Sequence, residues 1–162
     1  LRLFAVAVGM EEVAKGVRED TGGNRGTHID KYLYEAGADP EDGHGWCGMF
    51  INWVFTEAGN RCGETFPIDK WKMWSGRKLK NWVMAYPSKI IDPYTTPLMG
   101  GDIYIMKSKN GNGHIGMVRG MTIPGNDTMY TIDGNQSTHA AMGLSVRART
   151  RSVNDMDVIF RI

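Results

Sequence analysis

The chain has 162 residues, of which 41% are hydrophobic and 23% charged, values typical of a globular protein of one-domain size. Its 19 basic and 18 acidic side chains leave a formal net charge of +1, so the charge does not favour nucleic acid as a partner. The two cysteines allow at most one disulfide and lack the paired spacing of a structural zinc site, which leaves the redox compartment open. We therefore predict a single domain over residues 1–162.

The first part of the chain has the spacing of amphipathic helices. The apolar run 3–8 is too short to span a bilayer or to form the core of a signal peptide, and the sequence leaves a removed signal open. Apolar residues recur at helical spacing at Val6, Met10, Val13 and Val17. The glycine pair Gly22 and Gly23 then closes the predicted helix. A second helix is predicted with Thr27 as its cap, Asp30 in its first turn and Gly37 at its end.

Two further helices are predicted in the middle of the chain. The segment from Trp46 to Ala58 has no polar face apart from Asn52 and Thr56, so we expect a helix inside the protein rather than on its surface. Three tryptophans before Pro87 then indicate another amphipathic helix: Trp71, Trp74 and Trp82.

After Pro97 the chain changes to short β-rich runs separated by Gly, Pro, Asn and Asp. These runs are "GDIYIM", "GHIGMVRG", "TMYTIDG", "LSVRARTRSV" and "DVIFRI", and "IPGND" between the second and the third is typical of a hairpin turn. Helices followed by strands favour an α+β fold, in which N-terminal helices pack on a C-terminal antiparallel sheet.

Cys47 stands in "GHGWCGMF", where the predicted buried helix begins. A helix N-terminus carries partial positive charge and unpaired N–H groups, which stabilise a thiolate and lower the thiol pKa from its usual value of about 8.5. The glycines before the cysteine leave room for a substrate to approach. The alternative is that Cys47 is simply a small buried hydrophobic residue.

A nucleophilic cysteine needs a base, and the chain has four histidines. His114 in "GNGHIGMV" begins a predicted central strand between glycines, and a strand holds an imidazole more rigidly than a loop does. His28 and His139 lie in polar segments, so we expect them at the surface. His44 is three residues before Cys47 and within its reach, which also leaves half of a metal site as an alternative.

The imidazole in turn needs an acceptor that orients it. The stretch "YTIDGNQ" offers Asp133 or Asn135 from the end of the next strand, although "DGN" alone is equally typical of a turn. The order Cys, His and then Asp or Asn suggests nucleophilic catalysis. Such residues are too common for their order alone to define a family.

The chain resembles the CHAP family, the cysteine- and histidine-dependent amidohydrolases/peptidases of bacteriophage lysins and bacterial wall hydrolases. The resemblance rests on "GVREDTGGNRGTHIDKYL", "GWCGMFINWVF", "GGDIYIM", "GHIGMVRG" and "IDGN", which follow the family's order over nearly the whole chain. It implies a papain-like α+β fold with Cys47 as nucleophile, His114 as base and Asp133 as the acid that orients it. Asp133 stands where Glu is common, so Asn135 beside it is a further candidate for that role. Gly48 stands where Ala is usual, a change that we expect to be harmless.

The resemblance also implies a reaction, the hydrolysis of an amide bond in peptidoglycan through a cysteine thioester. The enzyme would be an N-acetylmuramoyl-L-alanine amidase or an endopeptidase of the peptide stem or cross-bridge. We expect a bacteriolytic, endolysin-like monomer that acts on the cell wall, either secreted or phage-encoded and released at lysis. Peptidoglycan is its expected partner, with no nucleic acid, membrane, cofactor or metal. The acidic loop "DPEDGH" leaves calcium open, because some CHAP domains bind it, although the loop's oxygens do not alternate as a loop cage prefers.

Two functional alternatives remain, a noncatalytic binding module on the same fold and a cysteine amidohydrolase that acts on an amide outside the wall. For the substrate groove, the candidates are Trp46, Trp71 and Trp74, with core packing as the alternative for each. Cys62 follows a helix end and has no base nearby in sequence, so we expect it to be dispensable.

The stretch "VRARTRSV" predicts a cationic stripe along one strand face, because Arg147, Arg149 and Arg151 alternate with smaller residues. One interpretation is a solvated edge that discourages aggregation. The other is a surface that attracts anionic wall polymers, in which case binding would weaken at high salt.

Overall fold

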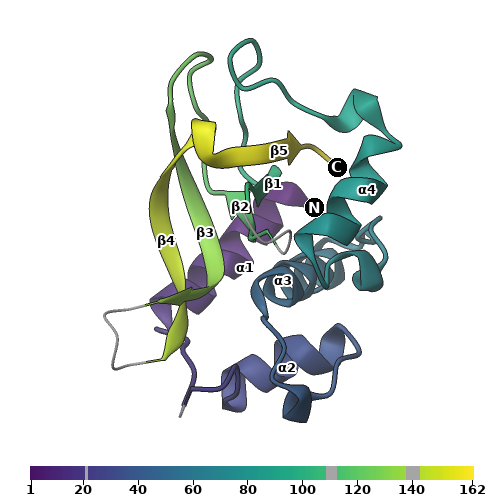
Figure 1. The fold of residues 1–162 in the computed structure, drawn as a ribbon, viewed down its shortest axis with the longest axis vertical. Coiled ribbons are helices and arrows are strands. Elements are labelled where there is room, and N and C mark those ends of the chain that lie inside the picture. Colours follow the sequence, from purple (N-terminus) through teal and green to yellow (C-terminus); the bar gives the residue numbers. More distant parts are fainter. Residues whose placement is uncertain (21, 109–112, 138–142) are drawn as a thin grey trace.

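The structure of the protein, a computed structural model, describes residues 1–20, 22–108, 113–137 and 143–162. The helices are α1 (Arg2–Ala14), α2 (Thr27–Glu35), α3 (Cys47–Cys62) and α4 (Gly76–Met84). The strands are β1 (Ile103–Met106), β2 (Ile115–Val118), β3 (Thr128–Ser137), β4 (Leu144–Ser152) and β5 (Met156–Phe160). They form one antiparallel sheet in the order β4-β3-β2-β1-β5, so the predicted α+β fold is confirmed (Figure 1).

The main hydrophobic core lies between the sheet and the helices α1 and α3 (Figure 1). Side chains alternate along β1 as the pleat requires: Ile103 and Ile105 enter this core, whereas Tyr104 belongs to a smaller cluster on the opposite face. α3 is buried along most of its length and contacts α1, α2, β2 and β3. The prediction that the helix after Trp46 lies inside the protein is therefore confirmed. No helix among the described residues has the length and apolarity needed to cross a membrane.

α1 ends earlier than the apolar spacing predicts. The face that it turns toward the core also differs from the predicted one. Gly16 has a left-handed φ of 66°, which stops the helix after Ala14 and leaves Val17 buried outside it, where its carbonyl accepts a hydrogen bond from Val146. The fully buried helical positions are Ala5, Val8, Gly9 and Glu12, and the predicted Val6, Met10 and Val13 are only partly buried. Glu12 is accommodated in this face by hydrogen bonds from Lys15, Lys31 and Tyr32.

The starts of α2 and α4 also differ from their predicted forms. The N-cap of α2 is Gly26, whose N–H donates to Asp30, while the predicted cap, Thr27, uses its hydroxyl on Asp20 instead. Of the three tryptophans, only Trp82 lies in α4. Ser75 caps the start of that helix, and Trp71 and Trp74 precede this cap in the sequence. The predicted turn in "IPGND" is confirmed by a left-handed Gly125 and a hydrogen bond from Asn126 N–H to the Ile123 carbonyl.

Gly48 has a packing role that the comparison with Ala does not suggest. A Cβ at this position would overlap the carbonyl oxygen of Met73 and lie 2.8 Å from Cδ1 of Ile115. The segment that precedes α4 can approach the start of α3 only because that side chain is missing. Gly48 is thus not interchangeable with Ala on this backbone, and the close approach places Met73 directly against the start of α3.

Candidate active site

Cys47 is the first residue of α3, as the sequence predicts. The first backbone hydrogen bond of the helix runs from Phe50 N–H to the Trp46 carbonyl, so the preceding N–H groups are not used by the helix ladder. The backbone N–H groups of Gly48 and Ile115 lie near the Cys47 sulfur and help to lower the pKa of the thiol. The thiol is half-buried and free of any disulfide.

His114 lies directly before β2 and connects Cys47 to a carboxylate on β3. Its Nε2 is 2.7 Å from Oδ1 of Asp133, and the ring lies close enough to Cys47 for the thiol and the imidazole to shift each other's pKa. The contact between α3 and β2 brings the cysteine and the histidine together, and the pairing of β2 with β3 adds the aspartate. The three residues predicted as nucleophile, base and acid are therefore in contact in the order that the sequence analysis expects.

Asp133 is fully buried, and donors surround its carboxylate. The Thr131 hydroxyl donates to Oδ2 at 2.7 Å, Arg151 Nε lies 3.2 and 3.3 Å from the two oxygens, and the Tyr104 hydroxyl donates to Oδ1. Gly116 makes room for this cluster, because a Cβ there would be 2.6 Å from Oδ1 of Asp133. A buried charge with this many partners is fixed in position and remains ionised.

The contacts shift all three pKa values in the direction that favours a charged cysteine–histidine pair. Burial raises the pKa of the Cys47 thiol, but the hydrogen bond and charge of His114, with two backbone N–H groups, outweigh it and leave the pKa below its ordinary value. Burial lowers the pKa of His114, but Asp133 and the thiol together raise it to about 9. Burial likewise raises the pKa of Asp133, and His114 and Arg151 lower it further than burial raises it. Thiolate and imidazolium therefore coexist near neutral pH.

Asn135, the other predicted support for the imidazole, does not contact His114. β3 carries a bulge between Asp133 and Gln136, and Asn135 has a left-handed φ of 58° there. Its Nδ2 packs against Gly45, at 3.3 Å from where a Cβ would be, and its Oδ1 is buried with no partner in the described part of the chain. The bulge moves Gln136 onto the face of Asp133 in place of Asn135.

Gln136 therefore occupies the position beside the imidazole, which the sequence analysis missed. Its amide nitrogen is 3.2 Å from Nε2 and 3.4 Å from Nδ1 of His114. Its amide oxygen accepts hydrogen bonds from Arg149 at 2.6 Å and Arg151 at 2.8 Å, which fixes the orientation of the amide. Arg151 thus contacts both Asp133 and Gln136.

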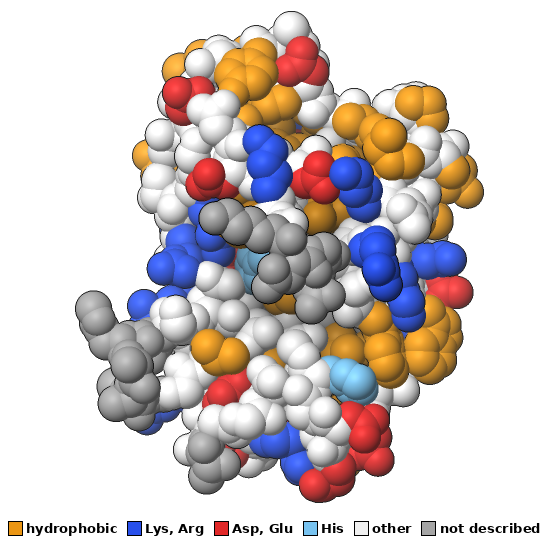
Figure 2. Space-filling model, viewed as in Figure 1, with side chains coloured by type: hydrophobic (Ala, Val, Ile, Leu, Met, Phe, Trp, Pro, Cys, Tyr) orange, Lys and Arg blue, Asp and Glu red, His pale blue; other side chains and the backbone are white. Residues whose placement is uncertain are grey.

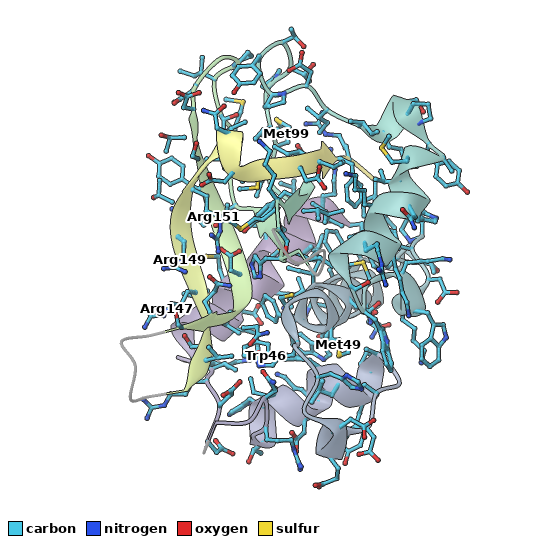
Figure 3. The ribbon with its side chains drawn as sticks, in the orientation of Figure 1. Trp46, Met49, Met99, Arg147, Arg149 and Arg151 are labelled. Carbon is cyan, nitrogen blue, oxygen red and sulfur yellow. The ribbon has the colours of Figure 1, made fainter. Side chains whose placement is uncertain are left out.

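The three arginines of β4 do not form the free cationic stripe predicted from their alternation. Figure 3 shows Arg147, Arg149 and Arg151 in succession along β4, and Figure 2 shows basic side chains over the same edge. Arg151 is mostly buried because its guanidinium pairs with Asp133, and Arg149 extends to Gln136. Arg147 is exposed, and its Nε donates to the Ser145 hydroxyl. Two members of the stripe consequently belong to the candidate site.

The remaining histidines lie away from this arrangement or beside it. His28 is exposed, as expected, and His139 lies outside the described residues. His44 contacts Asp42, with Nε2 3.4 Å from Oδ2, and its ring centroid is 5.3 Å from that of Trp74. Across the described ranges, no group of three or more His, Cys, Asp and Glu side chains is arranged to hold a metal ion.

The three tryptophans proposed for the groove divide into one core residue and two surface residues. Trp46 has no exposed surface, packs 5.9 Å from Tyr32 and donates its indole N–H to Glu19, so it cannot line a groove (Figure 3). Trp71 is 49% exposed, and its ring centroid is 4.9 Å from that of the half-buried Trp74. The groove prediction therefore fails for Trp46, whose large ring fills the space beneath the start of α3.

In this α+β fold a cysteine at a helix start lies next to a histidine, and the histidine contacts a buried carboxylate. These are the residues of a cysteine hydrolase. A family model, the CHAP domain, matches residues 39–135, and the chain belongs to this family. CHAP domains are typically cysteine- and histidine-dependent amidohydrolases or peptidases. The match contains Cys47, His114 and Asp133 and ends one residue before Gln136. No curated protein and no solved structure matches the chain.

Proposed function

We propose that the protein hydrolyses an amide bond of peptidoglycan, as an amidase or a peptide endopeptidase, through a thioester on Cys47. The contact series from Cys47 through His114 to Asp133, within a CHAP domain, carries this proposal. His114 accepts the thiol proton, and the thiolate attacks the amide carbonyl. The imidazolium then protonates the leaving amine, and water hydrolyses the thioester with His114 again as the base.

The start of α3 also supplies donors for the developing oxyanion. The Cys47 N–H is not used by the helix ladder, and the partial positive charge of the helix N-terminus adds to its effect. Asp133 holds the ring of His114 in one orientation and stabilises the imidazolium. In this mechanism Asp133 does not itself become protonated, because its pKa remains low.

Trp71 and Trp74 are proposed to contact the substrate beside this centre. The ring of Trp74 lies beside that of His44, which precedes Cys47 by three residues, with the two planes tilted by 52°. Met73 packs directly on Gly48. The two indoles present an aromatic surface on which sugar rings can stack. This surface is next to the start of α3, where a bound amide would meet the thiolate.

The pH profile of hydrolysis follows from the two shifted groups. Activity is expected to rise as the Cys47 thiolate forms, at a pH below the usual thiol value, because its pKa is lowered. It is expected to fall as pH passes through about 9, the raised pKa of His114, because the imidazolium that protonates the leaving amine is then lost. Rates of amine release from purified walls measured across the pH range give the profile. Activity that still increases above about pH 10 would contradict this assignment.

The two cysteines provide a test of the nucleophile against a noncatalytic module. They occupy opposite ends of the 16-residue α3, about 22 Å apart at 1.5 Å per residue, so they cannot form a disulfide with each other. We expect iodoacetamide at about pH 6 to label Cys47 faster than Cys62, because the pKa of the Cys47 thiol is lowered by His114 and the neighbouring backbone N–H groups. Cys62→Ser is expected to keep full hydrolytic activity. Equal labelling rates, or equal loss of activity on replacing either cysteine, would support a noncatalytic fold or a shared role.

Arg151→Gln is expected to move the basic limb of the pH profile to higher pH. Removing the guanidinium leaves the negative charge of Asp133 unopposed, so the imidazolium of His114 becomes more stable and its pKa rises. The hydroxyl groups of Tyr104 and Thr131 still donate to the carboxylate and hold it in place. The measurement is the pH dependence of kcat/KM.

Arg147→Gln is the matched control for Arg151→Gln. It removes the same charge from the same strand, but Arg147 is exposed and hydrogen-bonds Ser145 rather than the candidate site. Its basic limb should coincide with that of the parent protein. If the basic limb moved equally in both variants, the effect would be the general loss of a positive charge. If the basic limb of Arg151→Gln instead moved to lower pH, Asp133 would no longer be held beside His114.

A further inference from the structure

α3 carries a polar stripe that the candidate active site does not use. Asn52, Thr56 and Asn60 follow one another at intervals of four residues along this helix. At about 100° per residue, these positions lie roughly 140–220° around the helix from Cys47. The stripe therefore faces the side of α3 opposite the thiol.

The stripe forms one wall of a pocket of about 250 Å³. The opposite wall comes from the end of α2 and from the segment between α3 and α4, and the residues that complete the lining are Glu35, Glu64, Thr65, Phe66, Ile68 and Lys70. Phe66 is held in place by stacking on Phe55, with ring centroids 4.7 Å apart. The pocket is thus built from fixed elements and has both polar and apolar walls.

Asn52 is the most informative residue of this pocket. It is only 2% exposed, yet its side chain forms no hydrogen bond with any described residue. The amide atoms are not among the fully buried polar atoms that lack a partner, so they keep contact with the pocket and are not sealed in the core. Here the amide lies at the pocket wall, where a ligand would pair with it.

The charges of the pocket favour a neutral ligand. Two carboxylates, Glu35 and Glu64, and one ammonium group, that of Lys70, line the pocket, and Lys70 Nζ extends to the backbone carbonyl of Glu35 at 3.5 Å. Glu35 and Glu64 would repel an anion but can accept hydrogen bonds from hydroxyl groups. Side-chain amides and threonine hydroxyls both donate and accept, which suits a polyhydroxylated molecule.

The size and the apolar wall narrow the ligand further. Pockets for drug-sized ligands have volumes of about 300–1,000 Å³, so this pocket suits one small ring. Phe66 and Ile68 offer an apolar surface to the C–H face of such a ring. We propose that the pocket between α2, α3 and residues 64–70 binds one neutral sugar unit of a glycan, on the side of α3 opposite Cys47. The sugar pocket itself does not depend on the proposed function. Only the further choice of the wall glycan as the source of the sugar rests on that function.

A titration with chito-oligosaccharide tests the pocket without requiring hydrolysis. The Cys47→Ser protein, labelled with ¹⁵N, is titrated with N-acetylglucosamine tetramer, and saturable shifts are expected in the side-chain amide signals of Asn52 and Asn60. Asn52→Leu and Asn60→Ala are each expected to bind the tetramer about tenfold more weakly, the effect of one or two lost hydrogen bonds. Asn81→Ala, on the exposed face of α4 outside the pocket, is the control and should bind normally.

Thermal melting separates a binding role of Asn52 from a structural one. Because its amide has no partner in the protein, Asn52→Leu should melt at the same temperature as the parent or higher. A lowered melting temperature with unchanged sugar affinity would overturn the proposal, as would the absence of saturable shifts. Asn60→Ala changes an exposed position and keeps the binding test valid if Asn52→Leu does not fold.

The source of the sugar is tested separately by cosedimentation of the same variants with purified walls. Weaker cosedimentation of Asn60→Ala than of Asn81→Ala supports the wall glycan. Tetramer binding without a difference on walls would retain the sugar pocket and overturn the wall glycan as its source. Neither result depends on turnover, so loss of hydrolysis and loss of sugar binding remain distinguishable.

Discussion

Replacing Cys47 with Ser is expected to reduce amide hydrolysis by at least about 10³-fold while the fold survives. Serine has nearly the same shape, but His114 and the backbone N–H groups that stabilise a thiolate cannot make an alkoxide near neutral pH. Release of new amine groups from purified walls measures the loss. Unchanged circular dichroism and melting temperature serve as the control for folding.

His114→Ala is expected to cost about as much, and the double variant little more than either single change. The thiolate depends on His114 for its formation, so removing either residue removes the function of both. Residues that act as one unit are strongly non-additive in this way. If the two losses instead multiplied in the double variant, Cys47 and His114 would be acting independently and the proposed ion pair would be wrong.

The second large effect is expected at Asp133, and it should exceed that at Asn135. Asp133→Asn keeps the size of the side chain but removes the charge that raises the pKa of His114. We expect a loss of about 10²–10⁴-fold and a basic limb displaced to lower pH, because the imidazolium is then less stable. Asn135→Ala should reduce activity less than about tenfold, since its side chain does not contact the ring.

The two variants together identify the third member of the site. The pH dependence of kcat/KM is the decisive readout, because a merely structural defect lowers the rate without moving the limb. A larger loss in Asn135→Ala, or an unmoved basic limb in Asp133→Asn, would assign the orienting role to a residue other than Asp133.

The three site residues that the structure brings together, Cys47, His114 and Asp133, carry local signals in the sequence. Periodicity and turn residues predict a cysteine at the start of an apolar helix, a histidine at the start of a strand and an aspartate at the end of the next strand. The aspartate lies within β3 rather than at its end. Pairing of β2 with β3 then brings the histidine and the aspartate together. Local periodicity and turn residues also mark the order of helices and strands, and that order was sufficient to predict the α+β fold.

The supporting residues depend on geometry that alternation alone does not reveal. In a regular strand Asn135 would share a face with Asp133, but the bulge after Asp133 puts Gln136 there. Arg151 pairs across the sheet with Met129 and reaches Asp133 along the strand, a contact between distant positions in sequence. The "DGNQ" sequence contains the glycine and asparagine typical of a bulge, which is the one signal that points to it.

Burial in the first helix and at Trp46 was predicted less well because tertiary packing decides it. The apolar spacing of α1 continues past Gly16, where the backbone turns away, so Val17 belongs to the core without belonging to the helix. Trp46 precedes a cysteine that is half-exposed, yet its ring turns inward to Tyr32 and Glu19. Adjacent residues at a helix start point in different directions, which composition does not show.

Mass spectrometry of purified peptidoglycan digested by the protein, before and after alkylation of Cys47, tests the central claim most directly. We predict fragments with newly freed amino and carboxyl groups from a single type of amide bond, and their disappearance once Cys47 is alkylated in protein whose Cys62 has been replaced by Ser. Fragments cut only at glycosidic bonds, or equal release by the alkylated protein, would contradict a cysteine amide hydrolase.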